Sequence, residues 1–195
     1  MTKKITIVLM LVFAVGSAQF LEQKKDLKTT EGFFDFHYNE KEDELYLEVN
    51  NVDQEFIYVH ALKSGLGSND IGLDRGQLGG TAIVKFIKAG NKLLLIQPNQ
   101  DYRAITDNAA EKASVEEAFA KSVLYGFEIK ETKGSAYIID LTPFLLEDAH
   151  GVARRLKTNR EGSYKVDKSR SALALTNTKS FPKNTEFEAL ITFTG

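Results

Sequence analysis

Three histidines, His37, His60 and His150, are the only imidazole groups of the chain, and cysteine is absent. Imidazole exchanges protons near neutral pH and is the commonest protein ligand of metals. A zinc site typically draws two histidines from one helical face, and no such pair occurs here. We therefore predict neither a metal ligand nor a catalytic residue, and interpret each histidine as structural. A small hydrolase using His60 or His150 is the minor alternative.

Residues 65–80 contain six glycines in sixteen positions, together with acidic and basic side chains. Such a composition is typical of a loop that needs positive φ angles or approaches another surface closely. The spacing does not match a dinucleotide-binding loop, and the closing glutamate of an EF-hand is absent. The segment is either a docking loop that contacts a partner or a structured loop whose charges hold its own shape. The candidate contact residues are Asn69, Asp70, Asp74 and Arg75.

A second polar cluster contains Asp148, His150 and Arg154, with Arg170 further along the chain. A guanidinium group binds a carboxylate through two parallel hydrogen bonds. Arg154 and Arg170 are therefore candidates for holding an acidic partner, and surface salt bridges are their alternative role. We interpret the adjacent carboxylates of Glu147 and Asp148 as a solvated acidic face.

The elements that must position these residues are mostly strands. Residues 56–62 are apolar on both faces, which indicates a central strand, and residues 82–87 and 92–97 flank a Gly-Asn turn that predicts a hairpin. A capping pattern followed by apolar residues at helical spacing predicts a helix over 108–126, and a shorter helical stretch covers 144–156. Many strands with about two helices predict an α+β domain around a largely antiparallel sheet.

The N-terminus has the three parts of a secretory signal peptide. Two lysines precede an apolar run of about eleven residues, shorter than the ~20 that span a bilayer. Small residues then lead to an expected cleavage between Ala18 and Gln19. We predict export to the periplasm or the exterior of a bacterial cell. The expected division is a helical signal peptide at 1–18, a flexible lead-in at 19–31 and a single α+β domain at 32–195.

The charge balance disfavours nucleic acid as a partner. Cleavage would remove two lysines and leave 23 basic against 27 acidic residues, a net charge near −4. These charges are evenly mixed, with no basic block that could neutralise a row of phosphates. After the signal peptide no stretch reaches 18 apolar residues, so we expect no membrane span in the mature chain.

The glycine-rich segment also carries a resemblance. The run from Gly65 to Gln77 resembles the N-terminal domain, of unknown function, of large secreted bacterial zinc-dependent metalloproteases of metzincin-like type. The similarity extends from about Gly32 to Gly195. Further matching pieces follow in order, at 97–99, 102–103, 122–127, 148–152, 169–173 and 181–186.

The resemblance implies a longer protein whose downstream part carries an extended H-E-x-x-H zinc motif. That motif is absent here, so the resemblance implies zinc in the downstream part and no cofactor in this chain. Its partners would be the downstream protease domain of the same polypeptide and a protein or peptide substrate. We expect a non-catalytic N-terminal module, or a fragment, that packs on or regulates the protease. The alternative is a free-standing exported module that recognises a peptide or glycan through residues 65–80.

Overall fold

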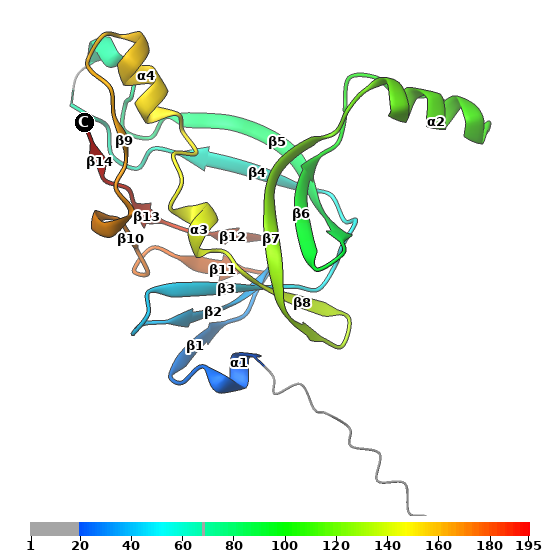
Figure 1. Ribbon diagram of the computed structural model, residues 1–195, viewed down its shortest axis with the longest axis horizontal. Helices are drawn as coiled ribbons and strands as arrows, with labels where there is room; N and C mark the ends of the chain where they lie inside the picture. The colour runs from blue at the N-terminus through cyan, green and yellow to red at the C-terminus, as the bar shows by residue number, and fades with distance from the viewer. Residues whose placement is uncertain (1–19, 68) are drawn as a thin grey trace, which may run out of the picture.

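The computed structural model describes residues 20–67 and 69–195. Its centre is an eight-stranded antiparallel sheet in the order β1-β2-β3-β8-β7-β6-β5-β4, curved into a half-barrel (Figure 1). The strands of this sheet are β1 (Leu27–Thr30), β2 (Asp35–Asn39), β3 (Glu44–Val49), β4 (Phe56–Ala61), β5 (Leu78–Ala89), β6 (Lys92–Gln97), β7 (Ser122–Lys133) and β8 (Ala136–Asp140).

The core lies on the concave side of the sheet, where alternate residues of each strand converge. Val49, Val84, Leu93 and Ile139 are fully buried there. The C-terminal segment crosses this side and packs Leu173, Leu175 and Phe187 against the core. Its short strands are β9 (Lys165–Val166), β10 (Ala172–Leu173), β11 (Lys179–Phe181), β12 (Asn184–Glu186), β13 (Ala189–Leu190) and β14 (Phe193–Thr194).

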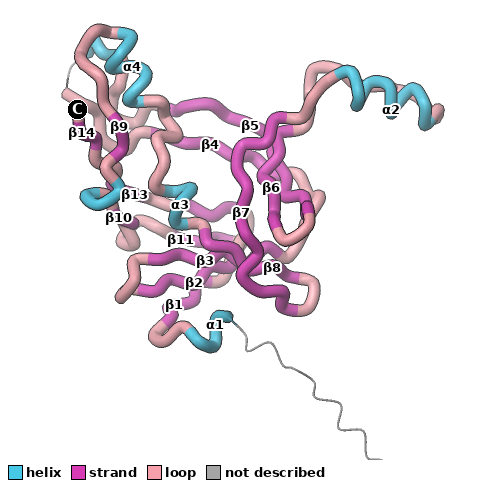
Figure 2. Tube along the Cα trace, viewed as in Figure 1, coloured by secondary structure: helices cyan, strands magenta, loops and turns pink. Residues whose placement is uncertain are grey.

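Helices are few and short. The α-helices are α1 (Phe20–Gln23), α2 (Ala109–Ala118), α3 (Thr142–Leu145) and α4 (Val152–Thr158), and the 3-10 helices are η1 (Asn69–Ile71) and η2 (Lys168–Arg170). Figure 2 shows α2 at the end of an arm that leaves the body of the molecule, away from every other helix. Among the helices of the described residues, none is long and apolar enough to cross a membrane.

The predicted fold class is confirmed: the domain is built on a largely antiparallel sheet, and two helices of its described residues have seven residues or more. The expected signal peptide and its cleavage site at Ala18 and Gln19 lie outside the described residues. The composition predicted a flexible lead-in up to residue 31, but within it α1 forms and β1 pairs antiparallel with β2. Pairing satisfies the backbone groups of β1 that face β2, and the polar sequence of β1 did not indicate this pairing.

The predicted helix over 108–126 begins correctly but ends too late. Asn108 caps α2 by accepting a hydrogen bond from the Ala110 backbone amide at 2.9 Å. The helix stops at Ala118, and β7 begins at Ser122 because residues 122–128 pair with β6. Strand pairing therefore overrides the helical spacing of Val123. The predicted helical stretch over 144–156 is likewise two helices, interrupted by Gly151 in a left-handed conformation at φ 70°.

The prediction that residues 56–62 form a central strand is wrong. The strand β4 lies at one end of the sheet, and among residues 20–67 and 69–195 it pairs only with β5. Its side chains alternate between half-buried and exposed, so Phe56, Tyr58 and His60 face inward while Ile57 and Val59 face solvent. Apolar residues on both faces of a strand suggest that both faces are buried. In β4 only the inner face is partly buried, and the outer face is exposed to solvent.

Candidate functional site

The glycine-rich segment folds onto α4, which brings the two predicted polar clusters together. Leu73, 2% exposed, packs with Val152 and Leu156 in a small second core. The Asn159 side chain also donates a hydrogen bond to the Ile71 carbonyl at 3.0 Å. The segment is therefore a structured loop, as the second interpretation of its sequence expects, but it is anchored by an apolar side chain and not by its charges.

The predicted contact residues of this loop lie on its surface. Asp70, Asp74 and Arg75 are exposed, and within residues 20–67 and 69–195 they form no ion pair. The backbone amide of Asp74 donates to the Gln77 side chain at 3.3 Å. Asn69 belongs to η1, but its side chain lies outside the described part. The charges of the loop are available to solvent and do not hold its shape.

Asp148 has a structural role that its sequence context did not reveal. Its two carboxylate oxygens accept hydrogen bonds from the backbone amides of Val152 and Ala153, at 2.7 and 2.9 Å. These amides are orphan donors at the start of α4, and a carboxylate also interacts favourably with the helix dipole there. Asp148 is thus not part of a solvated face, since its charge is compensated by the helix.

The two predicted arginines lie in different surroundings. Arg170 donates from Nε to the Asp167 carboxylate at 2.8 Å, a local ion pair three residues apart. Arg154 is exposed on α4 and lies beside Gly151, where an added Cβ would meet its guanidinium at 3.1 Å. The structure therefore does not join these two arginines into one acidic-group site.

His60 and His150 meet, although the sequence separates them by ninety positions. Their rings are 5.3 Å apart at 90°, and the Nδ1 atom of each is buried without a hydrogen-bond partner. Burial, and then the nearby His150, lower the pKa of His60, so the His60 ring tends to remain uncharged at neutral pH. Gly79 makes room for the His60 ring, because an added Cβ would lie only 2.0 Å from Nε2.

The third histidine, His37, lies in the first half of the sheet, away from this pair. Thr29 contacts its Nδ1 at 2.9 Å, and Nε2 is 3.5 Å from the Glu48 carboxylate. No group of three histidine, aspartate or glutamate side chains that could hold a metal ion occurs among the described residues.

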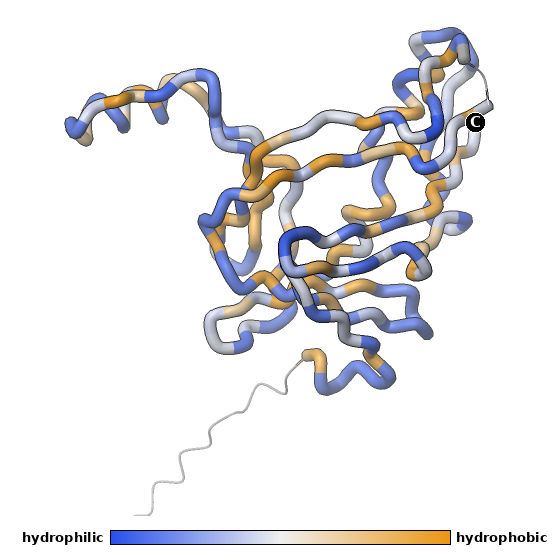
Figure 3. Tube along the Cα trace, turned by 180° about the vertical axis from the view of Figure 1, so that it is seen from behind, coloured by the Kyte–Doolittle hydropathy of each residue, from blue (hydrophilic) through white to orange (hydrophobic). Residues whose placement is uncertain are grey.

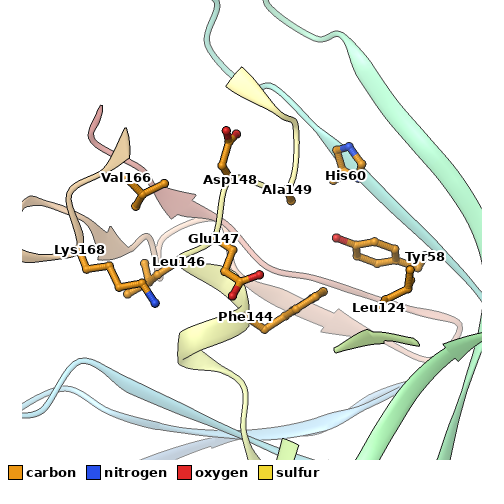
Figure 4. Close-up of a pocket in the computed structure, with 10 residues that line it drawn as sticks. All are labelled: Tyr58, His60, Leu124, Phe144, Leu146, Glu147, Asp148, Ala149, Val166 and Lys168. Carbon is orange, nitrogen blue, oxygen red and sulfur yellow. The ribbon is translucent and has the colours of Figure 1, made fainter. Parts of the chain in front are cut away.

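Beside the histidine pair is an open cavity of about 450 Å³, a size within the range of small-molecule and side-chain pockets, ~300–1,000 Å³. Tyr58 and His60 line it from β4, and Leu124 from β7. The opposite wall comes from the segment that joins α3 to α4 and from the C-terminal segment. Figure 4 shows all ten lining residues, including Phe144, Leu146, Glu147, Asp148, Ala149, Val166 and Lys168.

The floor of this cavity is aromatic. The Phe144 ring is 5.8 Å from Tyr58, 5.3 Å from Tyr125 and 5.7 Å from Phe127, all at tilted or edge-on angles. Burial raises the pKa of the Tyr58 phenol, and the Glu147 carboxylate raises it further. Burial and then Glu147 also raise the pKa of Tyr125. Both phenols therefore remain neutral while Glu147 provides a negative charge close to the rings.

Sequence reasoning missed this site. Tyr58, Phe144 and Glu147 are separated by up to 89 residues and form no motif. The one available signal was the alternation in β4, which places Tyr58 and His60 on one face. Of the predicted contact residues, Asp148 lines the cavity; His60, named for the hydrolase alternative, also lines it, and His150 lies next to His60.

The chain belongs to the family of the domain of unknown function DUF5117, whose model matches residues 76–195. The matched part extends from the end of the glycine-rich loop through β5 to β14 and includes α3, α4 and the wall of the cavity. No curated protein and no solved structure matches the chain significantly.

Proposed function

We propose that this chain is a non-catalytic accessory module of an exported bacterial zinc-dependent metalloprotease, which it holds or regulates. The observation that carries the proposal is the bare apolar outer face of β4 and β5. We call this surface the outer patch; it consists of Ile57, Val59, Leu78 and Ile83, which are 70%, 46%, 69% and 38% exposed.

The patch is continuous across the two strands. Ile57 pairs with Ile83 in the antiparallel register, so their side chains lie on the same face. Figure 3, which views the molecule from behind, shows hydrophobic segments along both strands. Contiguous exposed apolar surface is characteristic of an interaction site, whereas single exposed apolar residues are ordinary. In the described part of the chain no strand pairs with the outer edge of β4, and such an edge offers backbone groups that a partner strand can use.

The proposed occupant is the catalytic part of the same polypeptide, and zinc would be bound there. This assignment is supported by the resemblance of residues 65–77 and by the apolar character of the patch, which suits a permanent contact better than a transient one. The proposed location is the periplasm or the cell exterior, as the N-terminal sequence predicts.

The non-catalytic character is tested by incubating the purified chain with zinc and a general protein substrate. We expect no zinc-dependent proteolysis. Cleavage that requires zinc and stops with a chelator would contradict the proposal. The genomic sequence beyond codon 195 gives the second test, because an in-frame continuation that reaches H-E-x-x-H is expected.

The docking role is tested in that longer polypeptide with Ile57→Asp. Placing a charge in a buried apolar contact should loosen the module, so limited proteolysis between the two parts should accelerate about tenfold, as expected for loss of a hot-spot residue. Ile105→Asp is the matched control, since Ile105 is 100% exposed on the α2 arm. Equal cleavage rates in both variants would rule out the outer patch as the contact.

A free-standing module that recognises a peptide or glycan through residues 65–80 is the second candidate. The exposed Asp70, Asp74 and Arg75 favour it, since within the described part of the chain they form no ion pair. A native stop codon at 195 without a downstream protease, together with loss of ligand binding in Asp74→Asn, would favour this function over the first.

A further inference from the structure

The cavity on the inner side of β4 has a charge pattern that the proposed docking role does not use. Glu147 is the free carboxylate at this cavity: in residues 20–67 and 69–195 its side chain forms neither a hydrogen bond nor an ion pair. The adjacent Asp148 is engaged with two amides of α4. An unpaired carboxylate next to a desolvated wall attracts a cation more strongly than one in open water.

The aromatic floor of the cavity adds to its preference for a cation. In Figure 4 the Glu147 carboxylate points into the cavity, the Phe144 ring extends below it from the same side, and the Tyr58 hydroxyl points in from the opposite side. The faces of phenol and phenyl rings carry negative electrostatic potential, so they attract ammonium and guanidinium groups. Leu124 and Leu146 line the same cavity and provide apolar contact for an aliphatic stem.

We propose that this cavity binds the basic side chain of a peptide, lysine or arginine, with its cationic head at Glu147 and its stem against Tyr58 and Phe144. The cavity of about 450 Å³ is large enough to admit such a side chain with part of its backbone. Its open shape suits a group presented by a chain, not an enclosed small molecule. The site lies on the face of β4 opposite the outer patch, so the two can be occupied together.

Lys168 sets the direction of the bound peptide. It lines the cavity at the end away from Tyr58 and His60 (Figure 4), and none of the ion pairs of the described residues includes it. Its charge repels a second basic residue and favours an acidic neighbour on the ligand. A neutral oligosaccharide would leave both Glu147 and Lys168 without a charged partner, which is why a peptide is the better fit.

The test is a titration of the purified protein with acetyl-Gly-Lys-Gly-amide, followed by NMR, with the norleucine analogue as reference. Norleucine keeps the stem and lacks the ammonium. We expect the lysine peptide to bind about tenfold more tightly, the order expected from one cation–π contact with a supporting carboxylate. Glu147→Gln should remove this difference, and Glu117→Gln, an exposed carboxylate on α2, should preserve it.

Lys168→Met should strengthen binding of the lysine peptide, because it removes a like charge from the cavity. Equal affinity for the lysine and norleucine peptides would overturn the proposal. So would unchanged discrimination in Glu147→Gln, the absence of binding at millimolar peptide, or preferential binding of a neutral trisaccharide that shifts the Tyr58 signals. None of these results bears on the outer patch, since Ile57→Asp leaves the inner face intact.

Discussion

The outer face of the sheet is covered in its first half, which includes β2 and β3, and is exposed in its second half, which includes β4 and β5. In the first half, β3 buries Leu45 to Val49 on both faces, because the chain itself covers the outside. The Phe20 ring of α1 lies edge-on to Tyr46 at 5.1 Å, and Lys133 forms an ion pair with Glu48 at 3.1 Å. In the second half, β4 and β5 leave Ile57 and Ile83 exposed.

This difference separates what stabilises the domain from what is available for partners. In the first half the residues of β3 are covered and Glu48 is ion-paired, so this half is stabilised by the chain itself. The second half has an apolar exterior, a cavity with an unpaired carboxylate and a projecting helix in which no residue is buried. We therefore expect partners to bind to the second half of the sheet, where the chain itself does not cover the apolar surface.

The largest effect on the free energy of unfolding is expected when buried volume is removed from the first half of the sheet. Ile139→Ala truncates a side chain with no exposed area, and we expect a loss of about 2–5 kcal/mol in the free energy of unfolding. Ile57→Ala, in the outer patch, should change it by less than about 0.5 kcal/mol. Urea unfolding measures both, and similar losses in the two variants would show that the outer patch already contributes to the isolated fold.

The next effect concerns α4, which packs against the glycine-rich loop. Asp148→Ala removes two hydrogen bonds to the first amides of the helix and should cost about 1 kcal/mol in the free energy of unfolding. Glu147→Ala is the control, since its carboxylate has no such partner in the described structure. If both substitutions had the same effect, the capping role of Asp148 would be wrong.

A pH titration tests the two halves separately. Burial and His150 lower the pKa of His60, so as the pH falls below about 6.5 the unfolded chain is protonated first and the free energy of unfolding decreases. His60→Gln should flatten this decrease between pH 7.5 and 5.5. Glu44→Gln should leave that window unchanged and act at lower pH.

Glu44 acts at lower pH because hydrogen bonds lower its pKa. Burial alone would raise the pKa of Glu44, but Tyr46 and Lys24 donate hydrogen bonds to its carboxylate and bring the pKa below 4.5. Its stabilising contribution is therefore complete above pH 4.5 and is lost as the pH falls through the lowered value. Identical pH profiles for His60→Gln and the unmodified protein would contradict the desolvated state of the histidine pair.

The smallest global effect is expected on the α2 arm. Asn108→Ala removes the cap of α2 and should increase amide hydrogen exchange over residues 109–118. The free energy of global unfolding should stay within about 0.5 kcal/mol, because no residue of α2 is buried. A larger global loss would mean that the arm is coupled to the sheet.

Much of the fold was predictable from local patterns. The hairpin of β5 and β6, the cap of α2 at Asn108 and the dominance of antiparallel strands depend on neighbouring residues, and all three are confirmed. The end of α2, the strand β1 and the edge position of β4 were not predictable. Each depends on which distant segment supplies backbone partners, and the order of strands in a sheet is not encoded in the periodicity of any one strand.

The candidate sites divide in the same way. The sequence by itself determined that the chain contains no thiolate chemistry, since it has no cysteine, and that its charges are mixed. It also determined which residues of β4 share a face. Only the tertiary structure decided that Asp148 caps a helix and that His60 meets His150. The tertiary structure also places Glu147 near the rings of Tyr58 and Phe144. The sequence could not show these roles, because Coulomb interactions and desolvation depend on the distances between segments that are far apart in the chain.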